Sequence, residues 1–167
     1  SDFSVSGGTV GVDDIMIINP PVTVPSGGSY LEDFESGTGG WQQRILTGAT
    51  QWQQGTPNGA TLDSALSGSK AFGTNLSSNY GNSSLCILER TFDLTAMSGN
   101  EHPLLKFGLN IDSESAWDGL QVQVQVGTHA YTLGSVGEPI NGQWYFDTDV
   151  DGIADGADGW SGSSGGN

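Results

Sequence analysis

The sequence predicts an all-β protein built as a β-sandwich. Two stretches, 105–111 and 120–126, alternate strictly between apolar and polar residues, as half-buried antiparallel strands do. Clusters of Gly, Asn and Ser separate these stretches from further short apolar segments, and no segment has the periodicity of an amphipathic helix. Several short strands with turn residues between them are typical of a sandwich.

In the two alternating stretches the apolar side chains are expected to face inward. The first set is Leu105, Phe107, Leu109 and Ile111, and the second is Leu120, Val122, Val124 and Val126. Shorter strands are expected at 29–35, 69–76, 84–92, 129–135 and 142–146.

The chain begins differently from the rest. Residues 1–18 contain a good strand pattern, and residues 19–30 follow it with Pro20, Pro21 and Pro25. Prolines favour an extended, semi-rigid connector with few hydrogen bonds. We therefore expect an N-terminal strand, a proline-rich connector and a main β-domain at 31–167.

The composition limits the partners. The chain has 19 Asp and Glu against 4 Lys and Arg, and its net charge is −15. The four cations are scattered, so the sequence lacks a basic patch for nucleic acid, and an anionic membrane surface would repel it. No stretch is long and apolar enough to span a membrane. The low charge content and many small polar residues suit an extracellular β-protein.

Negative charge is concentrated in the segment 147–158, DTDVDGIADGAD. Its carboxylates repel one another unless a cation neutralises them, and calcium prefers about six to eight oxygen ligands. The spacing resembles the calcium loops of thrombospondin type 3 repeats, with Gly152 at the sharp turn. A solvated acidic loop is the alternative. The calcium ligands expected from the resemblance are Asp147, Asp149, Asp151, Asp155 and Asp158 through carboxylates, and Ile153 through its carbonyl.

Most of the main domain resembles a known family. The segments 33–43, 51–84, 112–127 and 158–166 look like the MAM-like jelly-roll modules of secreted bacterial surface proteins and metallopeptidases. The resemblance implies a jelly-roll sandwich with an accessory, adhesive or structural role, and no catalysis in the module itself. We accordingly expect no catalytic residues.

The order of the strands departs from that family. In such modules the segment GWSGSSGG is followed by further strands, the last of which resembles residues 11–17. Here that signature stands first, which fits a fragment across tandem repeats, a circular permutation, or a strand that completes a neighbouring subunit. In the third case Val10, Val12, Ile15 and Ile17 would enter the neighbour's sandwich and build a head-to-tail polymer. Closure onto the chain's own sandwich remains the alternative.

Two further kinds of site are expected. A second cation site would draw on Asp14, Asp33, Glu35 and Asp118, with Asp33 and Glu35 on one face of a strand. Two sequons, at Asn75 and Asn82, could carry glycans, and a plain polar loop is the alternative there. We therefore expect a calcium-stabilised structural subunit of an extracellular bacterial fibre or adhesin. The alternative is a carbohydrate- or substrate-binding accessory module of a secreted hydrolase. The five tryptophans could form a sugar platform in such a module, whereas packing is their other expected role.

Overall fold

A computed structural model of the chain describes residues 20–136, 145, 147–153 and 157–163, with the side chain of Asp149 excepted. The described residues form eleven short strands and no helix, so the all-β prediction is confirmed for them. A closed sandwich is not seen in these ranges, because the strands pair within five small sheets. None of the described residues belongs to a helix long and apolar enough to cross a membrane.

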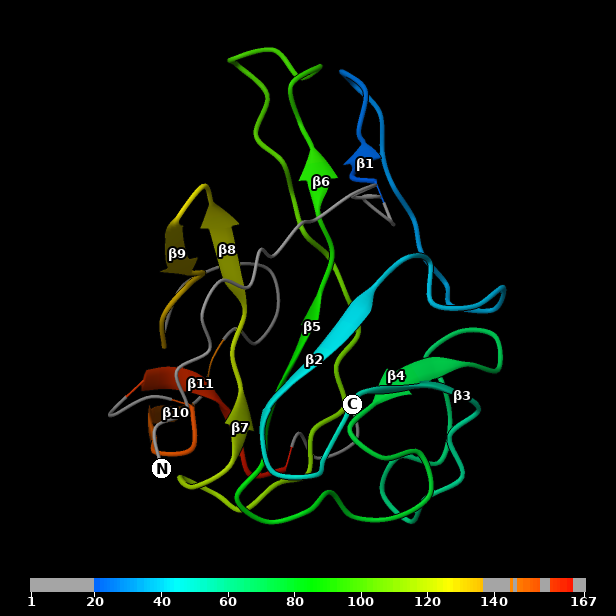
Figure 1. The fold of residues 1–167 in the computed structure, drawn as a ribbon, viewed down its shortest axis with the longest axis vertical. Helices are drawn as coiled ribbons and strands as arrows, with labels where there is room; N and C mark the ends of the chain where they lie inside the picture. Colours follow the sequence, from blue (N-terminus) through cyan, green and yellow to red (C-terminus); the bar gives the residue numbers. More distant parts are fainter. Residues whose placement is uncertain (1–19, 137–144, 146, 154–156, 164–167) are drawn as a thin grey trace, which may run out of the picture.

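The sheets lie around one antiparallel pair (Figure 1). This pair consists of β2 (Gln42–Thr47) and β5 (Leu85–Glu89), with Gln42 opposite Glu89. On one side lie β3 (Gln53–Gly55) and β4 (Ala71–Gly73), which also pair antiparallel.

A three-stranded sheet on the other side carries half of the buried residues of the described chain. Its middle strand is β11 (Ala157–Ser161), flanked by β10 (Asp147–Val150) and β7 (Gly119–Leu120). The chain continues from β7 into a hairpin of β8 (Gln123–Val126) and β9 (His129–Thr132). Gly127 adopts a φ of 60° in the two-residue turn, where a residue without a Cβ avoids strain.

The buried core of this region is small and aromatic. Tyr145, Val150 and Trp160 are buried, and the Tyr145 and Trp160 rings meet edge to face with centroids 4.5 Å apart. The Tyr145 hydroxyl accepts a hydrogen bond from Val122 N at 2.7 Å and donates one to Val122 O at 3.2 Å. This ring therefore ties the chain between β7 and β8 to β11.

A second aromatic cluster lies between the connector and the β3–β4 pair. Phe34 contacts Phe72 and Trp41 edge to face at 5.0 and 6.5 Å, and Phe92 continues the row to Trp41 and Tyr30. Phe34 has a φ of 61°, which is rare for a bulky residue. The strand expected at 29–35 is therefore wrong, because this backbone turns where a strand would stay extended.

The connector is attached to the body in its described part. Its strand β1 (Val22–Thr23) pairs in parallel with β6 (Phe92–Asp93), and Gly27 N donates to Glu101 Oε1 at 2.6 Å. The chain that precedes Pro20 lies outside the described residues.

The two alternating stretches behave differently. The segment 104–111 forms no strand, and Leu104, Leu105 and Phe107 are exposed there, so the expected strand is wrong. Alternation fixes which side chains share a face, but a strand also needs a neighbouring edge to pair with. In β8 the alternation is present, yet Val124 and Val126 are exposed rather than inward, because no described strand covers their face.

We expect the substitution Tyr145→Phe to lower the free energy of unfolding by about 1–3 kcal/mol, because it leaves the N–H of half-buried Val122 without its acceptor, while the Val122 carbonyl keeps the bond from Leu133 N. Urea unfolding measures the change. Tyr131→Phe is the matched control, since that ring lies on the exposed hairpin. Equal losses in the two variants would contradict the role of the Tyr145 hydroxyl.

Candidate functional site

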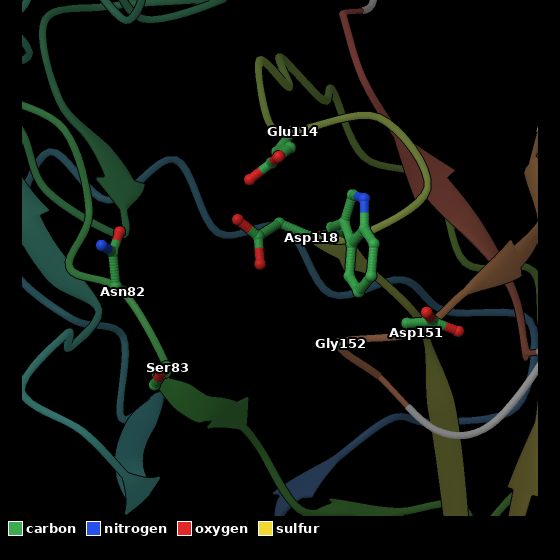
Figure 2. Close-up of a pocket in the computed structure, with 7 residues that line it drawn as sticks. Asn82, Ser83, Glu114, Asp118, Asp151 and Gly152 are labelled. Carbon is green, nitrogen blue, oxygen red and sulfur yellow. The ribbon is translucent and has the colours of Figure 1, made fainter.

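An open cleft of about 400 Å³ lies between the loops that precede β5, precede β7 and follow β10. Figure 2 shows Asn82 and Ser83 on one side of the gap, facing Glu114 and Asp118 across it. Asp151 and Gly152 continue the second wall. The complete lining is Asn82, Ser83, Glu114, Trp117, Asp118, Asp151 and Gly152.

The loop at 113–118 is held by its own turn and by β11. Trp117 N and Asp118 N both donate to Glu114 O, at 3.1 and 2.9 Å. Ala116 adopts a φ of 67°, and its N–H donates to Ser161 Oγ at 2.8 Å. Since Ser161 is buried, this contact fixes the loop to the centre of the sheet.

The turn after β10 fixes the same loop from the other side. Asp151 N donates to Ala116 O at 3.0 Å, and Gly152 N donates to Trp117 O at 2.7 Å. A Cβ on Gly152 would lie 2.3 Å from Trp117 O. Gly152 is therefore needed for a close approach of two backbones. The sequence analysis had instead placed this glycine at a sharp turn around a calcium ion.

A hydrogen bond at Asp118 connects the two walls. Tyr80 Oη donates to Asp118 Oδ2 at 2.9 Å. The pKa of Tyr80 is raised, first because the ring is partly buried and then because its proton is held by this carboxylate. Tyr80 comes two residues before Asn82, so the bond sets the spacing of the cleft.

The residues predicted to bind calcium lie mostly in the β10–β11 hairpin. Asp147 and Asp149 belong to β10, Asp151 and Ile153 follow it, and Asp158 lies on β11, where its Oδ2 accepts from Val136 N at 2.9 Å. Asp155 falls outside the described residues. Among the residues that are described, no three His, Cys, Asp or Glu side chains gather as a metal site would require. The calcium site thus stays a prediction.

The described residues of the predicted second cation site each make separate local contacts. Glu35 accepts from Ser69 N and Lys70 N through Oε1, at 2.8 and 2.7 Å, and these turn contacts lower its pKa, with the Ser69 backbone N–H contributing most. Asp33 Oδ1 accepts from Glu35 N at 3.0 Å within a turn, so the two do not share the face of a strand. Asp118 lies in the cleft, and Asp14 is outside the described residues.

The two sequons differ in accessibility. Asn75 is half-buried, and its amide nitrogen donates to Ser78 Oγ at 2.8 Å, so it belongs to a local turn. Asn82 is exposed in the cleft. The predicted inter-subunit residues Val10, Val12, Ile15 and Ile17 lie outside the described residues.

The sequence did not predict that these residues line one cleft. Asp118, Asp151 and Asn82 were each assigned to a different site, and Glu114 and Ser83 were not singled out at all. The walls come from segments about 30 residues apart or more, and hydrogen bonds made by Ser161, Asp151, Gly152 and Tyr80 unite them. The local signal was the turn-rich segment 112–119 between two strand patterns.

Fold and site together define an all-β protein with an open, acidic cleft between loops. Over 78 residues, 46% of its length, the chain is 36% identical to Bacillopeptidase F of Bacillus subtilis (strain 168). The aligned part covers 5% of that protein, whose name identifies a peptidase. No family model matches the chain, and no solved structure matches it.

We expect Gly152→Ala to destabilise the protein by about 1–3 kcal/mol, because the new methyl group overlaps the Trp117 carbonyl and neither backbone can move freely. Gly99→Ala is the control, since nothing lies within 4 Å of its added Cβ. Thermal unfolding of both variants measures the difference. Equal melting temperatures would show that the approach of the two loops is not tight.

Proposed function

We propose that this chain is a non-catalytic structural module of an extracellular bacterial protein that joins neighbouring copies through strand addition. The observation that carries the proposal is an uncovered apolar face on the β8–β9 hairpin. Val124 lies opposite Tyr131 and Val126 opposite His129, so all four side chains share this face. Val126 and Tyr131 are 64% and 56% exposed. Exposed apolar strand faces of this kind commonly mark protein interfaces.

The hairpin also offers strand edges. Among the described strands, β8 and β9 pair only with each other. Unpaired edges recruit further strands, and the segment 9–18 has the apolar content to serve as one. In the proposed assembly Ile15 and Ile17 of one copy extend the valine face of the next, and each buried side chain contributes about 1.5–3 kcal/mol.

The finer parts of the proposal follow the family resemblance. The module is a MAM-like jelly roll, and calcium bound at 147–158 stabilises its C-terminal part. The match to Bacillopeptidase F supports a module that occurs within larger proteins, because the shared stretch is only 5% of that peptidase. The same match supports an extracellular location.

The assembly predicts a specific pattern of rescue. Val126→Lys disables the accepting face and Ile17→Lys disables the donated strand, so each variant alone should stay monomeric. Mixed together, they should form one capped heterodimer, because a single donor and a single acceptor remain. Light scattering coupled to size exclusion measures the masses.

Gln125→Lys is the matched control, since it adds the same charge on the opposite face of β8. It should assemble like the unaltered chain. The proposal fails if the unaltered chain remains monomeric at all concentrations, or if mixing the two variants yields no heterodimer.

Calcium removal gives a separate expectation. A chelator should lower the melting temperature, because linkage stabilises the folded state by about 2.7 kcal/mol when free calcium is 100 times its dissociation constant. Asp149→Asn should weaken this response, whereas Asp63→Asn, far along the chain at an exposed position, should keep it. Identical melting curves with and without chelator would remove calcium from the proposal.

A further inference from the structure

We propose that the cleft at Trp117 binds a saccharide, with the indole face against a sugar ring and the surrounding side chains on its hydroxyl groups. This site is independent of the assembly through β8 and β9, because none of its lining residues belongs to that hairpin. The inference rests on the exposure of Trp117, its fixed backbone, and the mixture of polar groups around it.

The indole of Trp117 is exposed although its backbone is tightly held. The side chain is 59% exposed and lines the cleft. Its N–H donates to Glu114 O and its carbonyl accepts from Gly152 N, so the backbone that carries the ring is fixed before any ligand arrives. A backbone that is already held in place loses little conformational entropy on binding, and the exposed indole suits a ligand with a flat apolar face.

The polar side chains around the indole are available for binding. Within the described part of the chain, the side chains of Asn82, Glu114 and Asp151 make no hydrogen bond, and Asp118 uses Oδ2 for Tyr80. The carboxylates only accept hydrogen bonds, whereas the Asn82 amide and the Ser83 hydroxyl both donate and accept. Sugar hydroxyls also do both, so they can use both walls shown in Figure 2.

A cationic ligand is the competing occupant of this cleft. An ammonium or guanidinium group can donate to the carboxylates, but unlike a sugar hydroxyl it offers no acceptor to the amide N–H groups of Asn82 or the hydroxyl of Ser83. The described carboxylates of the cleft do not form a group suited to a metal ion. An open cleft of about 400 Å³ has the size of a small-molecule site and admits a ring from an extended chain.

Isothermal titration of the full chain with neutral oligosaccharides of glucose, mannose, xylose and galactose tests the inference, with oligolysine as the cationic probe. We expect saturable binding of at least one neutral oligosaccharide that persists in high salt. Trp117→Ala should weaken it about tenfold or more, and Trp117→Phe should restore part of the affinity. Leu31→Ala, which removes an exposed apolar side chain outside both the cleft and the β8–β9 hairpin, should bind normally.

Two results would overturn the site. The first is binding of oligolysine alone, lost in high salt, which would make the cleft a receptor for basic side chains. The second is no binding of any oligosaccharide by a chain whose melting temperature shows that it is folded. Both results leave the assembly experiment unaffected, because that experiment reads mass and uses variants outside the cleft.

Discussion

The pairing of β11 between β10 and β7 is the constraint on which both the core and the cleft depend. Trp160 of β11 is buried against Tyr145, and the next residue, Ser161, turns its hydroxyl to the N–H of Ala116. One strand therefore packs the core and fixes the loop that carries Trp117. Any change that shifts β11 along its neighbours would move both together, since a shift of one residue exchanges the two faces of a strand.

Several of the many acidic side chains stabilise turns, a role that the net charge of the chain does not indicate. Carboxylates accept hydrogen bonds from backbone N–H groups in the turns, as Glu35 does at Ser69, Glu101 at Ser98 and Asp93 at Thr95. These bonds lower the pKa of Glu35 and Glu101, whereas the pKa of Asp93 is lowered most by the Thr95 hydroxyl and then by the Thr95 N–H. A lowered pKa contributes stability that is present above the ordinary carboxyl range and is lost as the pH falls through the folded value. Hydrogen bonds to these carboxylates thus hold loops that are rich in Gly and Ser.

The sequence predicted local pairing better than tertiary position. The alternating stretch at 120–126 and the short strand expected at 129–135 correspond to the β8–β9 hairpin, because the two strands are separated only by a two-residue turn. The same alternation at 105–111 gave no strand, since pairing there depends on an edge supplied from elsewhere. The turn at Phe34 was missed because its φ of 61° is supported by distant rings, among them Phe72. The cleft was missed for the same reason, since Ser161 and Tyr80 hold it together across the chain.

The two exposed apolar features that carry the proposals have different surroundings, and this difference separates their proposed roles. The face of Val124, Val126 and Tyr131 is broad, lies on a hairpin with open edges, and has glutamines on its reverse side. Another strand can bury such a face with its apolar side chains and can pair with the open edge through its backbone groups. Trp117 is instead a single ring among carboxylates and an amide, on a loop whose backbone groups are already paired. A strand would leave those polar groups without partners, whereas a hydroxylated ring can satisfy them. Strand addition on one surface and sugar binding on the other can therefore coexist in one molecule.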